Sequence, residues 1–161
     1  KDNIEYKGFV FIGLINVKGE PMVIEYNVRM GDPETEVVIP RLKNDLLEML
    51  VAATRQELNT IKIEEDQRFA CTVMAVSGGY PGDYEKGYTI HGLDKVNKKS
   101  ILFHAGTATK DGKVLTNGGR VLCITSYGNS IFEAVENSKE ELQNISYTGM
   151  SYRRDIGYEF E

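Results

Sequence analysis

Cysteine is scarce in this sequence, and long apolar runs are absent. Cys71 and Cys123 are the two cysteines among 161 residues, and each lies inside a short apolar stretch. Free cysteine is one of the most deeply buried residue types, so we expect two buried thiols in strands rather than a disulfide or a zinc site. No apolar stretch approaches the ~18 residues that cross a bilayer. Together these features favour a reducing, cytoplasmic setting.

The sequence also lacks an excess of basic charge. It has 19 Lys and Arg residues against 24 Asp and Glu residues, a formal net charge of −5 at pH 7. Because no basic block offsets the charge of a phosphate backbone, a nucleic-acid partner is disfavoured. A small anionic ligand is not excluded, since a single arginine can dominate a pocket. The apolar content of 41% is enough for one domain, or one and a half, with a real core.

Histidine is rare, and no internal repeat or low-complexity segment is found. His91 and His104 lie in β-like runs. Neither has a partner at the spacing of a metal site or a catalytic triad. We therefore expect both histidines to be structural.

The densest group of polar side chains spans residues 25–36, directly after an apolar run. It contains four carboxylates, one carboxamide and one guanidinium. Glu25, Asn27 and Arg29 alternate, so on a strand they share one face. The first two offer oxygen to a hard divalent cation, and the arginine can grip a phosphate. The alternatives are a solvated strand end for Glu25 and Asn27 and a salt bridge from Arg29 to a nearby carboxylate.

Apolar patterning before residue 61 predicts two strands and one helix. Residues 9–17 and 22–27 read as an antiparallel hairpin joined by a turn at residues 18–21. A ligand-rich loop stiffened by Pro33 follows. Residues 44–58 carry apolar side chains at helical spacing, and Asn44 or Asp45 can cap that helix. We expect the helix to cover one face of the hairpin.

A polar stretch at residues 61–67 marks the predicted boundary, giving one part at residues 1–61 and a second at 62–161. The second part contains short β-like runs separated by glycine turns and ends with a helix that opens on a capping box at Ser130–Glu133. The strands are predicted at residues 69–76, 101–107, 113–116 and 120–125. Residues 78–82 fit a structural turn better than a phosphate cradle. The predicted fold class is α+β, with a β-rich second part.

Residues 25–35 read Glu-Tyr-Asn-Val-Arg-Met-Gly-Asp-Pro-Glu-Thr and closely resemble the signature of the phosphoribosylamine–glycine ligases, also called glycinamide ribonucleotide synthetases. Five further blocks resemble the same family in the right order, at residues 8–14, 77–82, 103–107, 116–122 and 152–157. The family's N-terminal domain and its earlier ATP-grasp segments have no counterpart here. The resemblance therefore implies the last part of an ATP-grasp fold followed by the C-terminal domain.

The resemblance implies an ATP-dependent carbon–nitrogen ligase of purine biosynthesis. Such enzymes join glycine to 5-phosphoribosylamine through glycyl phosphate and need Mg²⁺ or Mn²⁺. Glu25 and Asn27 match the metal-ligand positions, and Arg29 matches an arginine beside the transferred phosphoryl group. The alternatives are another ATP-grasp carboxylate–amine ligase and a non-catalytic binding module. The chain alone is expected to be inactive, to expose apolar surface, and to need the missing segments of the enzyme as partners.

Four other charged residues are candidates for substrate binding. Asp32 and Glu34 could receive the ammonium group of glycine, hold Arg29, or shape their loop. Arg153 and Arg154 could bind the phosphate of the ribosylamine, although a surface or domain-contact pair is the slightly favoured interpretation.

Overall fold

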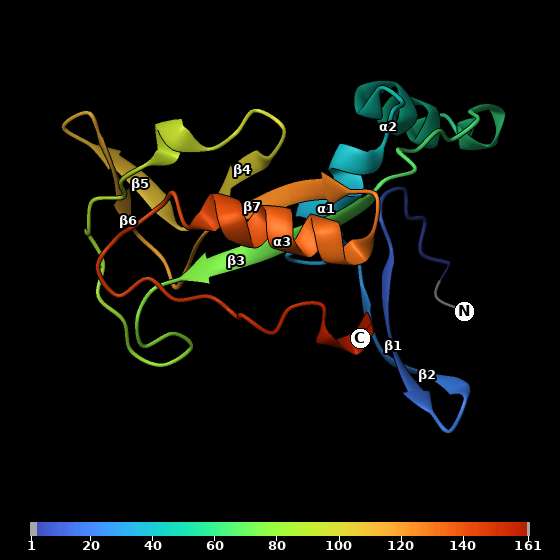
Figure 1. The fold of residues 1–161 in the computed structure, drawn as a ribbon. Coiled ribbons are helices and arrows are strands. Elements are labelled where there is room, and N and C mark those ends of the chain that lie inside the picture. Colours follow the sequence, from blue (N-terminus) through green and yellow to red (C-terminus); the bar gives the residue numbers. More distant parts are fainter. Residues whose placement is uncertain (1–2, 161) are drawn as a thin grey trace. The chain divides into compact units, whose positions relative to one another are not determined.

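The computed structural model describes residues 3–160 and contains two compact units, Lys1–Asp66 and Gln67–Glu161. Each unit combines strands and helices (Figure 1). The predicted α+β class is therefore confirmed. Within the described residues, no helix has the length and apolar character needed to span a membrane.

The first unit begins with an antiparallel hairpin of β1 (Phe11–Val17) and β2 (Glu20–Asn27). Lys18 and Gly19 form the turn with φ values of 56° and 93°, the left-handed pair that matches the twist of a two-residue hairpin. The amide of Gly19 donates to the side chain of Asn16 at 2.7 Å. The predicted hairpin is confirmed.

Two helices follow, whereas the sequence pattern predicted one. The first, α1 (Thr35–Arg41), has only seven residues and contains Pro40, so its periodicity is too short to recognise. The second, α2 (Leu46–Thr54), confirms the predicted helix but stops four residues early. Its N-cap is Asp45, whose carboxylate accepts from the amides of the second and third helical residues at 2.8 and 3.1 Å.

The hairpin keeps its apolar side chains exposed, so the expectation that a helix covers one of its faces is wrong. Leu14 is 56% exposed and Ile24 is 65% exposed. Within this unit α2 packs against the short 3-10 helix at Leu58–Thr60. Other exposed apolar residues of the hairpin are Ile12, Ile15, Val17, Met22, Val23 and Tyr26. The expected exposed apolar surface is thereby confirmed.

The end of the first unit is held by a short backbone pairing. Leu42 forms an antiparallel bridge with Glu65. The backbone carbonyl of Arg41 accepts from the amide of Asp66 at 2.7 Å, and the Arg41 guanidinium donates to the Asp66 carbonyl at 3.0 and 3.3 Å. The sequence-based boundary at residue 61 lies just before this pairing, which extends the compact unit to Asp66.

The second unit is built on a three-stranded antiparallel sheet in the order β3-β7-β4. These strands are β3 (Phe69–Val76), β4 (Ile101–His104) and β7 (Arg120–Gly128). The predicted strand at residues 69–76 is confirmed residue for residue. Residues 101–107 were predicted as one strand, but β4 stops at His104 and a new strand starts at Thr107.

A separate hairpin pairs β5 (Thr107–Lys110) with β6 (Lys113–Thr116). Its turn is Asp111-Gly112, with φ values of 50° and 72°, as the sequence predicts. The break before β5 comes from a close approach of two backbones. A Cβ on Gly106 would lie 2.6 Å from the Cα of Gly118.

One helix, α3 (Ile131–Leu142), packs on the sheet of the second unit (Figure 1). The hydroxyl of Ser130 caps it by accepting from the amide of Glu133 at 3.1 Å, which confirms the predicted capping residue. Its buried side chains are Ala134, Val135, Ser138 and Leu142, and they meet a core that includes Val73, Val121, Leu122 and Ile124. Packing of this stripe on β3 and β7 buries apolar surface and stabilises the unit.

Both cysteines are buried thiols in strands of this sheet, as predicted. Burial raises the pKa of the Cys71 thiol. The hydroxyl of Ser138 donates to the Cys71 carbonyl at 2.8 Å and so ties α3 to β3.

We expect Leu142→Ala to lower the free energy of unfolding by about 2–5 kcal/mol, because it leaves a cavity where the side chain is 1% exposed. Leu47→Ala on α2 is the matched control, since Leu47 is 70% exposed. Chemical denaturation of both variants measures the difference. Equal effects at the two positions would contradict the assigned core.

Candidate functional site

The predicted metal ligands lie at the end of β2. In the ladder with β1, Glu25 is opposite Gly13 and Asn27 is opposite Phe11. A Cβ on Gly13 would lie 3.0 Å from the Cγ of Glu25, so the glycine leaves room for that side chain. Glu25 is exposed and Asn27 is half-buried. Two residues apart on one strand, they point to the same side of the hairpin.

The side chain of Asn27 has an unsatisfied polar atom. Its Nδ2 is buried and has no hydrogen-bond partner among the described residues. A buried amide group without a partner costs free energy, and such groups in native proteins usually have a reason. Rotation of the amide by half a turn would put Oδ1 at this place, since the two atoms are distinguished only by their hydrogen bonds. Asn27 is thus suited to a partner that the described residues do not supply.

Arg29 leaves the strand and is exposed. Its Nη1 donates to the carbonyl of Met30 at 2.9 Å, which uses one of the guanidinium donors. This bond orients the side chain along its own backbone. A guanidinium held in this way can still present its planar fork to an anion.

The loop after Arg29 is folded around Gly31, which is buried. The amide and the hydroxyl of Thr35 donate to the Gly31 carbonyl at 3.1 and 2.6 Å, at the start of α1. A Cβ on Gly31 would lie 2.5 Å from the Oε2 of Glu34, so the Glu34 carboxylate closes over the glycine. Asp32 is exposed. The contact of Glu34 with the loop agrees with a shaping role.

The two predicted phosphate-binding arginines lie in the second unit. The Nε and Nη2 atoms of Arg153 donate to the two carboxylate oxygens of Asp155 at 3.0 and 2.7 Å. These hydrogen bonds, together with the opposite charge, raise the pKa of Arg153 and lower the pKa of Asp155. Arg154 is exposed. The structure therefore groups Glu25, Asn27, Arg29, Asp32 and Glu34 in one unit and the arginine pair in the other.

Three glycine-containing loops of the second unit meet at one end of its sheet. Ser77 donates from its hydroxyl to Gly118 and from its amide to Gly119, each at 2.8 Å. The amide of Gly106 donates to the backbone carbonyl of Arg120 at 2.8 Å. The loops approach so closely that a Cβ on Gly118 would lie 2.9 Å from the Cα of Gly106, which explains these two glycines structurally. Sequence reasoning found the three blocks separately but did not place them together, because no local pattern encodes a contact between distant loops.

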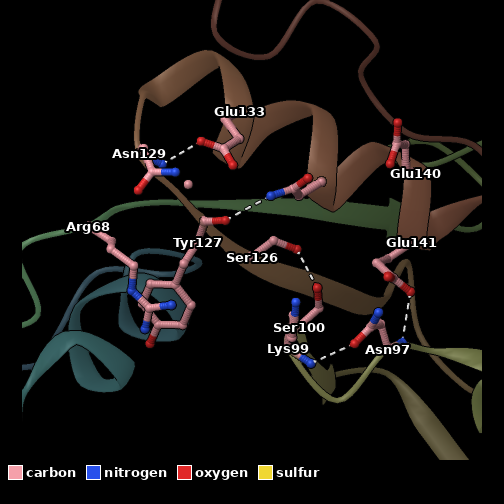
Figure 2. A pocket seen from close by; sticks show the side chains of 12 residues that line it. Arg68, Asn97, Lys99, Ser100, Ser126, Tyr127, Asn129, Glu133, Glu140 and Glu141 are labelled. Atoms are coloured by element: carbon pink, nitrogen blue, oxygen red, sulfur yellow. Dashed lines mark hydrogen bonds between the residues drawn. The ribbon is translucent and has the colours of Figure 1, made fainter.

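A polar pocket of about 450 Å³ lies at the opposite end of this sheet (Figure 2). The guanidinium of Arg68 lies 4.3 Å from the ring centre of Tyr127, whose carbonyl accepts from Asn137 at 2.8 Å. Ser100 and Ser126 share a hydroxyl hydrogen bond of 2.8 Å across its floor. Its described lining residues include none of the predicted site residues. The pocket draws on separate segments of chain, so no contiguous motif could have revealed it.

Neither histidine takes part in a metal cluster among residues 3–160, where no group of three or more His, Cys, Asp or Glu side chains is arranged to hold a metal ion. The Nδ1 of His104 is 3.0 Å from the hydroxyl of Thr107. His91 pairs through its backbone with Ser146. Glu25 and Asn27 could therefore hold a cation only together with oxygens from another source, such as a nucleotide phosphate.

Comparison with solved structures places the fold among the ATP-grasp ligases. A phosphoribosylamine–glycine ligase from Thermotoga maritima superposes with a TM-score of 0.73 at 38% identity, over 91% of this chain and 36% of that chain. The N5-carboxyaminoimidazole ribonucleotide synthetase of the same organism shares the fold, with a TM-score of 0.59 at 16% identity over 88% of this chain and 37% of that chain.

Family models identify the chain more closely. Residues 70–159 match the C domain of phosphoribosylglycinamide synthetase, and residues 1–35 match the ATP-grasp (A) domain of that enzyme. The chain belongs to the phosphoribosylglycinamide synthetase family. This confirms the family resemblance of the signature and of the later blocks.

Two curated relatives show how much of such proteins the chain represents. A phosphoribosylamine–glycine ligase from Caldanaerobacter subterraneus is 46% identical over 156 residues, which are 97% of this chain and 37% of the relative. The trifunctional purine biosynthetic protein adenosine-3 of Gallus gallus is 43% identical over 98% of this chain and 16% of its own length. The chain thus spans little more than a third of the ligase relative.

We expect Gly106→Ala to destabilise the second unit by about 1–3 kcal/mol, because the new Cβ would lie 2.5 Å from the Arg120 carbonyl and neither backbone can yield cheaply. Gly82→Ala serves as the control, since its Cβ would meet its nearest neighbour at 3.2 Å. Thermal unfolding followed by circular dichroism compares the two. A Gly106→Ala variant as stable as the control would refute the close packing of these loops.

Proposed function

We propose that the protein containing this chain is an ATP-dependent ligase that joins glycine to 5-phosphoribosylamine and forms glycinamide ribonucleotide. The main support is the 46% identity, over 97% of the chain, to a relative that carries the name phosphoribosylamine–glycine ligase. The match of the first 35 residues to an ATP-grasp domain supports the use of ATP. Relatives named as purine biosynthetic proteins support the place of the reaction in purine synthesis.

The proposed reaction has two steps. A carboxylate oxygen of glycine attacks the γ-phosphorus of ATP, so that ADP leaves and glycyl phosphate forms. The amine nitrogen of phosphoribosylamine then attacks the carbonyl carbon of glycyl phosphate. The bond from this carbon to the phosphate oxygen breaks, phosphate leaves, and the nitrogen loses a proton. In the first step two anions must approach each other, so catalysis depends on positioning and on neutralising charge.

Glu25 and Asn27 are the residues that we propose hold Mg²⁺ or Mn²⁺. A carboxylate and a carboxamide are hard oxygen donors, and the buried, unsatisfied amide of Asn27 supports a missing partner at this place. When bound, the cation would neutralise phosphate charge on the nucleotide. Arg29 would bind the oxygens of the transferred phosphoryl group and stabilise their charge.

The remaining candidates have less support from their contacts. The fold of Glu34 over Gly31 favours a role in shaping the loop, which leaves Asp32 as the candidate for the ammonium group of glycine. The fork between Arg153 and Asp155 favours a structural role for Arg153, so Arg154 is the better candidate for the ribosylamine phosphate. The two buried thiols agree with a reducing compartment such as the cytoplasm.

The partners we propose are ATP, glycine, 5-phosphoribosylamine and the other segments of the same enzyme. The exposed apolar side chains of the β1–β2 hairpin support this last partner, since they would be covered in a complete sheet. No nucleic acid or membrane is part of the proposal.

Glu25→Gln in the full-length protein should reduce kcat/KM by about 100-fold or more, because it removes the charged cation ligand. Glu20→Gln, at the other end of β2, is the matched control and should leave activity unchanged. Phosphate release from ATP, measured with both glycine and phosphoribosylamine and with each omitted, gives the rates. Full activity in Glu25→Gln would refute the metal assignment. Phosphate release that is just as fast when glycine and phosphoribosylamine are both omitted would refute the reaction.

The isolated chain should not cleave ATP when glycine and phosphoribosylamine are added. Its ATP-grasp match covers residues 1–35 alone, so most of a nucleotide site would have to come from elsewhere. The same phosphate assay on the purified chain checks this. Glycine-dependent ATP cleavage at a rate near that of the full-length protein would contradict it.

A further inference from the structure

A tyrosine that precedes β1 reaches both ends of the backbone that frames the proposed metal site. The hydroxyl of Tyr6 donates to the carbonyl of Phe9 at 2.8 Å and to the carbonyl of Val28 at 3.0 Å. One hydroxyl proton is shared between these two acceptors. Phe9 lies just before β1, and Val28 directly follows β2. The Tyr6 side chain therefore links the start of β1 to the end of β2 at the open end of the hairpin.

This tie falls where the regular ladder ends. The last paired residues are Phe11 and Asn27, and beyond them the chain bends away at Val28. Side-chain packing cannot hold this position, because Val28 is 73% exposed. The hydrogen bond from Tyr6 to the Val28 carbonyl takes the place of the next rung of the sheet. It fixes the peptide plane that joins Val28 to Arg29.

The segment that carries Tyr6 is itself anchored and fitted to this role. The ammonium group of Lys7 donates to the carbonyl of Thr54 at the end of α2, at 3.1 Å. Gly8 lies under the tyrosine ring, and a Cβ on it would stand 2.7 Å from the Tyr6 hydroxyl oxygen. A larger residue at position 8 would push the hydroxyl off its acceptors. Gly8 also has a φ of 156°, a conformation that strains any other residue, so both its backbone and its contact with Tyr6 favour glycine.

We propose that Tyr6 is a positioning residue for the metal and phosphate groups of this site. It holds the Val28 carbonyl, and the residues on either side of Val28 are Asn27 and Arg29. A functional side chain has to stay within about 0.5 Å of its working position. Loss of the hydrogen bond to the Val28 carbonyl would let the side chains of Asn27 and Arg29 move away from their working positions, although neither residue is substituted. The inference rests on the proposed function, since it assigns Tyr6 a role at that same site.

The test uses the full-length protein with Tyr6→Phe, which keeps the ring and removes the hydroxyl. Mn²⁺ binding in the presence of a non-hydrolysable ATP analogue is measured by electron paramagnetic resonance, beside kcat and KM. We expect Mn²⁺ affinity to fall about 3- to 10-fold, as for the loss of one hydrogen bond, and kcat to fall with it while the melting temperature changes little. Tyr26→Phe is the matched control, because it removes an exposed hydroxyl from the same hairpin.

Two further variants separate the possible failures. Gly8→Ala should weaken Mn²⁺ binding in the same direction, and its melting temperature is measured beside it, because the φ of 156° at Gly8 also strains a substituted residue. Tyr6→Leu replaces Tyr6→Phe if that variant does not fold. Glu25→Gln reports whether the metal site exists. Loss of Mn²⁺ affinity in Glu25→Gln with unchanged affinity in Tyr6→Phe and Gly8→Ala would overturn the role of Tyr6 and leave the proposed function standing. Unchanged affinity in all three would overturn both the role of Tyr6 and the proposed metal site.

Discussion

Alternation of side chains along β2 is the constraint on which the proposed site depends. A strand sends every second residue to the same face, and regular pairing of residues 25–27 with residues 11–13 of β1 puts Glu25 and Asn27 on one side, beyond the register shift at Ile24. Gly13 leaves space for Glu25, and the bend after Asn27 takes Arg29 out of the strand, where its guanidinium donates to the Met30 carbonyl. A shift of one residue in this pairing would turn Glu25 and Asn27 to the other side of the hairpin.

The second unit reaches stability in a different way. Its sheet is covered by α3, whose buried stripe closes a core of fully buried side chains such as Leu122 and Leu142. The β1–β2 hairpin, by contrast, exposes apolar residues on both faces, so its rigidity rests on backbone pairing and on ties such as the one from Tyr6. The part of the chain that carries the proposed chemistry is thus the part that depends most on neighbouring segments.

Local signals in the sequence predicted the elements that local physics decides. The strand at Phe69–Val76, the turn at Asp111-Gly112 and the cap at Ser130 each follow from periodicity, left-handed turn residues or a capping hydroxyl. The cluster of Glu25, Asn27 and Arg29 was visible for the same reason, since it is contiguous.

Features that depend on contacts between distant residues, and one very short helix, could not be predicted from the sequence. The break after His104 arises because Gly106 packs on Gly118, and α1 is too short to show a helical period. The polar pocket beside Tyr127 and the tie from Tyr6 to Val28 join segments far apart in the chain. The expected cover of the hairpin by a helix failed because a helical pattern shows that one face is apolar, but not which surface that face meets.

The most direct test of the central claim is a crystal structure of the full-length protein with Mn²⁺ and a non-hydrolysable ATP analogue, with anomalous data collected at the manganese edge. The account predicts an anomalous peak within coordination distance of both the Glu25 carboxylate and the side-chain oxygen of Asn27, in contact with nucleotide phosphate. A manganese peak on the nucleotide that touches neither side chain would contradict it.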